Sequence, residues 1–483
     1  MTADPTADPT ARLTALVGAT LIDGRGGPPV DDAVVTIRGD RIESVGTRHT
    51  IDLESHADVV DITGRFLLPG LIDVHVHYFE WMGELFLAHG VTTVKDVGND
   101  IAWIASTRDE VDSGRAHGPR IFFTGNGLDI PPPRRDHFIG IESEQMARRV
   151  VNILHEGGAM AIKVREMMPV EVLRPVVDEA HSLGLKVTGH LRAMRASDAA
   201  EAGIDGLEHA SGIVQSTLDP WLRIDLDTLE AKDIYAKYVA ERKSYSLISR
   251  PRGEALIADL ARRDVALIPT MSGWWRMATD RIEQFRSEDT TLAEDPSLAY
   301  VPEQALSIWR TSQLYDITDP DDLAQLEVGY DKIRHLLLRH RELGGRVLAG
   351  SDTYLSIPGL SLQRELLFLV DTGFSPLEVI SMATLDNAEF MGMADDLGSV
   401  EPGKLADLVV LDADPLATID NIASVSAVYR GGDRVDIGGP PLLPPARPTM
   451  VRPLWVERRL LEEGYRFTNP AFDQAPVSAS GCC

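Results

Sequence analysis

Two histidines near the end of an apolar run are the residues whose type and spacing point most directly to chemistry. The run 71–76 has the length and the β-branched content of a buried strand, and His75 and His77 lie two residues apart at its end. Side chains two residues apart project from the same side of a strand, so the two imidazoles converge. Taken alone, the pair fits two hydrogen-bonded core histidines as well as two ligands of a metal ion.

Four further polar residues lie within or just beyond other apolar runs, and they favour the metal site. They are Lys163, His190, His209 and Asp352. In a barrel of parallel strands, catalytic residues come from the carboxyl ends of several strands, so residues far apart in sequence meet at one face. Neutral imidazoles with a carboxylate suit divalent ions, and we expect zinc, with manganese, cobalt or iron as alternatives.

Lys163 stands inside the apolar run 161–164, where an ammonium group beside two cations would be strongly disfavoured. A neutral lysine can add carbon dioxide to form a carbamate, an anion with two oxygens that can bridge two metal ions. We therefore expect a CO2-derived carbamate on Lys163. The alternative is a snorkelling or salt-bridged lysine, which is the commoner fate of this residue type.

Asp352 is expected to be the catalytic acid and base as well as a metal ligand. A water molecule that bridges two metal ions has its pKa lowered to about 7, so hydroxide is available near neutral pH. As hydroxide attacks a carbonyl, Asp352 would accept the proton and then deliver it to the leaving amine, while the ions stabilise the oxyanion. Such a site would hydrolyse a carbon–nitrogen bond.

The elements that must position these residues follow a rhythm of strand and then helix. This rhythm predicts an α/β fold with parallel strands, and eight such units suggest a closed (β/α)8 TIM barrel. An open doubly wound sheet is the alternative, but no Gly-X-Gly-X-X-Gly turn follows the first strand. The eight candidate strands are residues 71–77, 91–94, 120–124, 161–164, 185–188, 204–207, 265–268 and 346–349.

Strand-like segments also flank the barrel, and we expect them to form a small β-sandwich domain built from both chain ends. They are residues 15–21, 33–38, 41–45, 406–412 and 423–430, with turn residues at Gly39-Asp40. The predicted division is 1–66 and 397–440 for the two halves of the β domain, 67–396 for the barrel and 441–483 for an extended C-terminal tail.

Composition excludes several classes of protein. The chain has 483 residues, which is too many for one small core, and its net charge of −27 repels phosphate groups. We therefore expect neither nucleic acid nor an anionic membrane as a partner. The sequence has no apolar run of the roughly 18 residues that a membrane span needs, and we expect its N-terminus not to be a signal peptide. Its only cysteines are Cys482 and Cys483, and a cytoplasmic enzyme fits best.

Taken together, these motifs resemble the amidohydrolase superfamily, in the branch of imidazolonepropionase-like proteins and metal-dependent Xaa-Pro dipeptidases (prolidases). The matching segments are residues 69–77 (Pro-Gly-Leu-Ile-Asp-Val-His-Val-His), 90–96, Lys163, 184–190, Glu208-His209, 349–352 and 403–409.

The resemblance implies two divalent metal ions. It implies that His75 and His77 bind the more buried ion together with Asp352, and that His190 and His209 bind the second. The carbamate on Lys163 would bridge the two ions. Imidazolonepropionases lack this lysine, so Lys163 favours the binuclear, dipeptidase-like side. On analogy with relatives we also expect a homo-oligomer.

Substrate contacts are expected on the loops after the strands. In the loop 125–137, His137 would polarise the substrate carbonyl, and Arg134 or Arg135 would bind a carboxylate. A solvent-exposed basic loop is the alternative.

Aromatic residues near the later strands are further candidates. Trp274 would form an apolar wall of the substrate pocket, with burial under the following insert as the alternative, and Tyr354 would reach the pocket. Two long inserts, at about 214–251 and 274–331, would form a lid or an oligomer contact, or else solvated helical decoration.

We therefore expect a metal-dependent hydrolase of an amide-type small molecule, either an N-acyl amino acid or an Xaa-Pro-type dipeptide. The alternatives are a urea, a carbamate or another xenobiotic amide, and the same site could open a lactone or cleave a phosphotriester. A non-catalytic scaffold is the remote alternative, which the presence of all six expected ligands disfavours.

Overall fold

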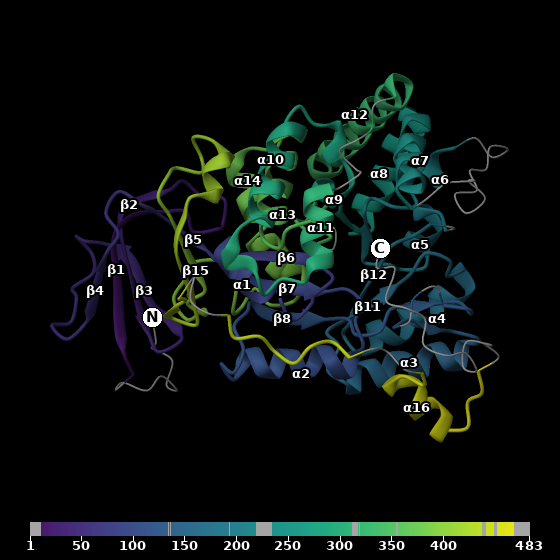
Figure 1. The fold of residues 1–483 in the computed structure, drawn as a ribbon, viewed down its shortest axis with the longest axis horizontal. Coiled ribbons are helices and arrows are strands. Elements are labelled where there is room, and N and C mark those ends of the chain that lie inside the picture. Colours follow the sequence, from purple (N-terminus) through teal and green to yellow (C-terminus); the bar gives the residue numbers. More distant parts are fainter. Residues whose placement is uncertain are drawn as a thin grey trace.

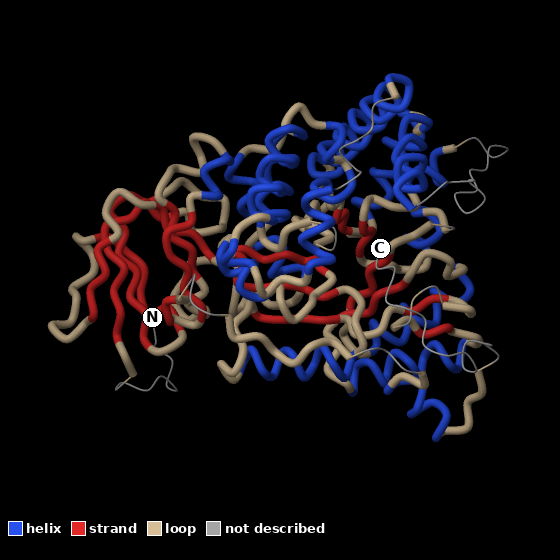
Figure 2. Tube along the Cα trace, in the orientation of Figure 1, coloured by secondary structure: helices blue, strands red, loops and turns tan. Residues whose placement is uncertain are grey.

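The structure is a computed structural model, and its strands form three sheets (Figures 1 and 2). It describes residues 11–133, 135, 137–192, 194–218, 234–311, 317, 319–353, 356–436, 441–448 and 452–467, with residues 234–238 described by their backbone only. Among these residues, no helix is both long and apolar enough to span a bilayer.

The largest sheet has eight strands and combines both ends of the described chain. Its strands are β1 (Leu13–Leu21), β2 (Val30–Arg38), β3 (Arg41–Thr47), β4 (Asp58–Asp61), β5 (Phe66–Pro69), β15 (Leu408–Leu411), β16 (Val425–Arg430) and β17 (Asp433–Arg434). Residues of β15 pair antiparallel with β5, for example Val410 with Leu67. The expected pairing of the two chain ends is therefore confirmed. The hydrogen bonds join these strands into one sheet, and the two-layered sandwich stays a prediction.

The other two sheets are parallel and lie in the larger part of the molecule. One consists of β6 (Leu71–Val76), β7 (Val91–Asp96) and β8 (Arg120–Phe123). The other runs in the order β10 (Ile139–Gly140), β9 (Leu128–Asp129), β11 (Ala161–Val164), β12 (Lys186–Gly189), β13 (Gly206–Glu208) and β14 (Ala266–Ile268). Each expected barrel strand except the last is present as a regular strand, and the α/β class with parallel strands is confirmed.

Single backbone contacts connect the two parallel sheets. Between β8 and β11, Met160 N donates to Phe123 O at 3.0 Å. Between β14 and β6 lies the segment 346–353, which forms only isolated bridges, from Val347 to Leu267 and from Thr353 to Val76. The eighth expected strand, at 346–349, is therefore not regular.

Two buried side chains explain why this segment is irregular. The Asn387 amide donates to Ile72 O at 2.7 Å and to Ala349 O at 2.8 Å, and Ala349 O also accepts from Val74 N at 3.3 Å. The Asp73 carboxylate accepts from Ser351 N at 3.0 Å and from Ser351 Oγ at 2.5 Å. Side chains thus take bonds that a regular ladder would make, just before Asp352.

Helices cover the parallel sheets (Figure 2). The first eight are α1 (Gly83–Ala88), α2 (Ile101–Asp112), α3 (Glu144–Glu156), α4 (Val170–Ser182), α5 (Ala196–Glu201), α6 (Ile213–Thr217), α7 (Ile234–Ser244) and α8 (Arg250–Arg262). The others are α9 (Met271–Trp274), α10 (Ile282–Ala293), α11 (Glu303–Thr311), α12 (Pro320–Glu342), α13 (Leu360–Thr372), α14 (Pro376–Met382), α15 (Leu385–Phe390) and α16 (Trp455–Glu462).

The described parts of the two inserts contact each other. Trp275 is buried, with its ring 5.3 Å from that of Tyr245 and 5.7 Å from that of Tyr330. Residues 219–233 lie outside the described residues, and the role of the inserts as a lid stays a prediction.

The C-terminal tail lies along α2 and α3 (Figure 1). Trp103 Nε1 donates to Pro445 O at 3.2 Å. The tail is not extended throughout, because α16 forms within it. The spacing of its buried Val456 and Leu460, one helical turn apart, gives that helix an apolar side.

Candidate metal centre

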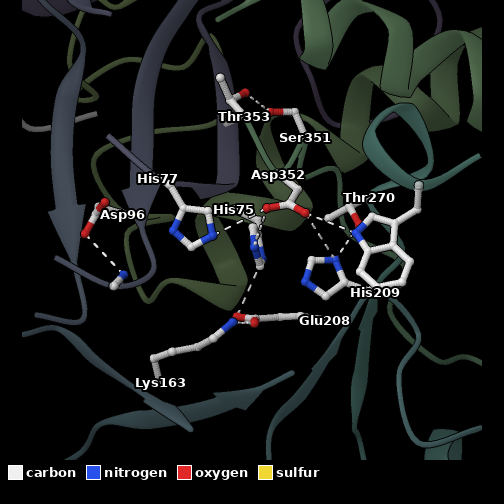
Figure 3. A network of polar contacts seen from close by, with 12 residues as sticks. His75, His77, Asp96, Lys163, Glu208, His209, Thr270, Ser351, Asp352 and Thr353 are labelled. Carbon is white, nitrogen blue, oxygen red and sulfur yellow. Dashed lines mark hydrogen bonds and ion pairs between the residues drawn. The ribbon is translucent and has the colours of Figure 1, made fainter. Parts of the chain in front are cut away.

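His75 and His77 point toward Asp352 (Figure 3). The Nε2 atom of each imidazole lies 3.4 Å from Asp352 Oδ1, and the two rings are 5.6 Å apart. Asp352 N donates to His75 O at 2.9 Å, which joins the two backbones directly. Beyond the strand, Tyr78 N donates to Asp96 Oδ1 at 2.9 Å and fixes the chain after His77. The expected convergence of the His75 and His77 side chains is present.

His209 and His190 join the same group from the ends of β13 and β12. The His209 ring lies 4.8 Å from that of His75 and 4.4 Å from that of His190. His209 Nδ1 is 3.8 Å from Asp352 Oδ2 and 2.7 Å from the Thr270 hydroxyl. One ligand atom each from His75, His209 and Asp352 lies within 4.8 Å of the others.

Lys163 contacts a residue that sequence reasoning did not single out as part of the site. Its Nζ lies against Glu208 Oε2, and both side chains are fully buried. Glu208 Oε1 accepts from the Thr188 hydroxyl at 2.8 Å and lies 3.6 Å from His75 Nδ1. The contact corresponds to the salt-bridged alternative for Lys163, and the carbamate stays a prediction. The sequence feature that could have identified Glu208 as a site residue is its position within an apolar run, directly before His209.

Burial sets the protonation of this site. It lowers the pKa of His75, His190 and His209 well below the ordinary value, and nearby cations add to the effect, so these imidazoles are neutral. Burial also lowers the pKa of Lys163 strongly. Burial opposes ionisation of Asp352, but its contacts with His209, His75 and His77 hold its pKa well below the usual range.

The donor atoms fit a divalent cation. Both ring nitrogens of His75 and Nε2 of His190 are buried, with no hydrogen-bond partner among the described residues. A buried polar group without a partner costs about 1–3 kcal/mol, so such nitrogens indicate that something else binds there. Neutral imidazoles beside an ionised carboxylate are suitable ligands for zinc and similar ions.

Backbone strain is concentrated at the same place. His209, Thr270 and Asp352 have φ angles of 58°, 48° and 53°, in the left-handed region that is uncommon outside glycine and rarest for a β-branched residue such as Thr270. Each such conformation costs about 1–3 kcal/mol and persists only where its surroundings hold it. All three residues follow the ends of neighbouring strands or bridges, as expected of a functional face.

Trp274 has a more specific role than the apolar wall that the sequence predicted. Its indole Nε1 donates to Asp352 Oδ2 at 3.1 Å, and its ring stacks on His209 at 4.7 Å. The short helix α9 that carries it is held by Glu365, whose Oε2 accepts from Ser272 N at 2.7 Å. Burial raises the pKa of Glu365 to about 8.

Of the other expected substrate contacts, His137 and Arg135 are among the described residues and have other neighbours. His137 is buried, with its ring 4.6 Å from Phe138 and its Nδ1 3.1 Å from Arg447 Nη2. Arg135 lies near enough to Arg165 that its charge adds to the effect of burial, which lowers the pKa of Arg165. Arg134 and Tyr354 lie outside the described residues.

Two buried arginines next to the histidines were not anticipated. Arg165 is 3% exposed and stacks on Phe138, and its charge helps to lower the pKa of His190. Arg192 Nε lies 2.8 Å from Glu166 Oε2. Both arginines stand two residues beyond an expected ligand, Lys163 or His190. That spacing could have predicted their place in the site, because alternate residues lie on the same side of an extended chain.

Comparison with known proteins is consistent with this geometry. The Amidohydrolase family matches residues 294–435. An imidazolonepropionase of Pseudomonas entomophila is 27% identical over 421 residues, covering 81% of this chain and 90% of the relative. An adenine deaminase of Mesorhizobium japonicum is 23% identical over 408 residues, covering 84% of this chain. The match spans only 55% of that deaminase.

A solved structure of a prolidase-like protein has a fold similar to that of this chain. A prolidase-like protein of Bifidobacterium longum superposes with a TM-score of 0.66 at 25% identity. The superposition covers 89% of this chain and 96% of that protein.

Proposed function

Because this chain is a member of the amidohydrolase superfamily and a hydrolase of carbon–nitrogen bonds, we propose that it cleaves an N-acyl amino acid or an Xaa-Pro-type dipeptide. The observation that carries the proposal is the convergence of His75, His77 and His209 on the ionised Asp352, with His190 in contact with His209. We also infer that the two parallel sheets are arcs of one (β/α)8 barrel, which the bridges of residues 346–353 support.

Two divalent ions, with zinc as the first choice, are proposed as the cofactor. His75 and His77 with Asp352 would hold one ion, and His190 and His209 would hold the other. When bound, these ions would acidify a water molecule and polarise the substrate carbonyl. The buried ring nitrogens of His75 and His190 that have no hydrogen-bond partner among the described residues support this assignment.

The two oxygens of Asp352 have different surroundings, which supports two roles. Oδ1 faces His75 and His77, on the side proposed for an ion. Oδ2 faces His209 and accepts from the Trp274 indole. We assign to Oδ2 the acceptance of a proton from the attacking water and its return to the leaving amine.

Lys163 is proposed to carry the bridging carbamate. Burial lowers its pKa, and a neutral amine is the form that attacks carbon dioxide. The nitrogen would form a bond to the CO2 carbon and lose one proton, and Glu208 lies against that nitrogen as a base. Labelled bicarbonate followed by carbon NMR tests this step, and a Lys163→Ala variant should regain activity with a short carboxylic acid.

A carboxylate on the substrate is favoured by the charge beside the histidines. Arg165 is buried, and its nearest described carboxylate oxygen, on Glu166, is 3.6 Å away. An arginine binds a carboxylate through two parallel hydrogen bonds, which a urea or a neutral amide cannot match. Arg165 thus favours N-acyl amino acids and dipeptides over neutral substrates.

Turnover of a small panel tests the proposal. The panel contains Xaa-Pro dipeptides, N-acyl amino acids, phenylureas and carbamates, each assayed with apoprotein and with protein loaded with zinc, manganese or cobalt. We expect metal-dependent hydrolysis of the acidic substrates and a loss for Arg165→Met in KM more than in kcat. Hydrolysis confined to phenylureas or carbamates would show that these, and not N-acyl amino acids or dipeptides, are the substrate class. Turnover by metal-free protein would overturn the mechanism.

A further inference from the structure

A cavity lies away from the metal centre, among β7, β8, β11, β12 and the end of α15. It measures about 80 Å³ and is lined by Lys95, Phe122, Met160, Lys186, Phe390 and others. Lys186 begins β12, whereas His190 follows its carboxyl end, so the cavity opens at the opposite end of that strand from the histidines. Met160 is exposed and marks its mouth.

Lys95 is the one charged side chain buried in this cavity among the described lining residues. It is 3% exposed, and its Nζ has no hydrogen-bond partner among the described residues. Its Nζ lies 5.6 Å from the centre of the Phe390 ring. Lys186 Nζ lies 5.1 Å from the same ring, but it has a partner in Asp205, at 3.5 Å.

The ammonium of Lys95 stays charged in neutral solution. Burial lowers its pKa to about 8, with Asp205 and Asp73 opposing the effect, so most molecules carry the proton at pH 7. A buried charge is retained at low cost only when a counter-charge or hydrogen-bond acceptor lies beside it. The cavity is the place from which such a group can approach Lys95.

The shape and walls of the cavity limit what that group can be. One water molecule needs about 10–15 Å³ by the same measure, so a molecule of several non-hydrogen atoms fits in about 80 Å³. Water alone is a poor occupant, since it seeks two to four polar partners and Lys95 and Lys186 are the only polar side chains among the described lining residues. A cation is repelled by the two lysines, and a dianion such as phosphate would lack donors.

We propose that this cavity binds a small carboxylic acid with an apolar or aromatic body. The carboxylate would pair with Lys95 and approach Lys186, and the body would lie between Phe122, Phe390 and Met160. The site is separate from the metal centre and does not depend on the proposed hydrolysis.

Benzoate is the probe for this site, used with the metal-loaded full chain. We expect saturable binding by calorimetry, a rise in Tm, and binding of the neutral isostere benzamide that is weaker by roughly tenfold or more. Lys95→Met, which keeps the length and removes the charge, should weaken benzoate binding by a similar factor. Lys186→Gln should weaken it less, because Lys186 already has a carboxylate partner.

Each alternative has a distinct outcome. If benzoate instead occupied the metal centre, Lys95→Met would bind it as the unchanged protein does, and the proposal would fail. Equal binding of benzoate and benzamide, or no saturable binding of benzoate, would also overturn it. Should Lys95→Met fold poorly, Phe390→Trp supplies a second test, because filling the cavity should abolish benzoate binding while Lys95 is retained.

Discussion

The indole Nε1 of Trp274 donates a 3.1 Å hydrogen bond to Asp352 Oδ2, on the side of the carboxylate that faces away from His75 and His77. The same ring stacks on His209 at 4.7 Å. One residue therefore fixes the rotation of the carboxylate and the plane of an imidazole. Trp274 is a positioning residue for Asp352, through a contact that links residues 78 apart in the sequence.

Trp274→Phe tests this relationship. A hydrogen bond to a charged acceptor contributes about 1.5–3 kcal/mol, so we expect kcat to fall roughly tenfold or more. The lost donor also raises the pKa of Asp352, so the acid limb of the pH–rate profile should move to higher pH. Kinetics across pH, with metal content measured in parallel, check both effects. Trp275→Phe is the matched control, since Trp275 contacts Tyr245 and Tyr330 instead.

Asp352→Asn separates proton transfer from metal binding. The amide keeps the size of the side chain but cannot accept the proton, so we expect kcat to fall by about 10²–10⁴-fold. Metal content should fall much less, because the four histidines remain. Metal analysis of the purified variant and its turnover on the best substrate provide the comparison. Near-normal turnover would remove Asp352 from the proposed acid and base role.

Glu208→Gln examines the residue that links Lys163 to His75. Glu208 Oε1 lies 3.6 Å from His75 Nδ1, so its charge favours the tautomer that leaves Nε2 free toward Asp352. Partners of this kind typically change metal affinity about 10–100-fold. Chelator competition should show that loss in Glu208→Gln and a smaller one in Thr188→Val, which removes only the hydroxyl bonded to Glu208. Equal affinities in both variants and the unchanged protein would contradict the role.

The ends of strands could be predicted from the sequence because they depend on local patterns. The alternation of His75 and His77, and the position of His190 and His209 after apolar runs, required only the geometry of a strand. The irregular segment before Asp352 could not be predicted from the sequence, because it depends on bonds between distant residues, such as those from Ser351 to Asp73.

Contacts between distant residues account for the other differences between the structure and the prediction from the sequence. Glu208 lies against Lys163, and Arg364 bonds to Asp289 at 2.7 Å across 75 residues. Neither pair leaves a periodic signal, because each depends on how separate elements meet. The helix α16 within the expected extended tail is a similar case, since its apolar side is stabilised by contacts with α2 and α3.

Lys95→Met should change the pH dependence of stability in a definite direction. Burial lowers the pKa of Lys95 from 10.5 to about 8, so between these values the unfolded chain holds a proton that the folded chain has lost. The free energy of unfolding of the unchanged protein therefore rises with pH in this interval. At pH 7 the variant should be more stable by up to about 3 kcal/mol, and the difference should shrink between pH 8 and 10. Urea unfolding at several pH values measures it, with Lys186→Met as the control, since that side chain is 37% exposed. A difference that stays constant with pH would show that Lys95 is not a buried cation in the folded protein.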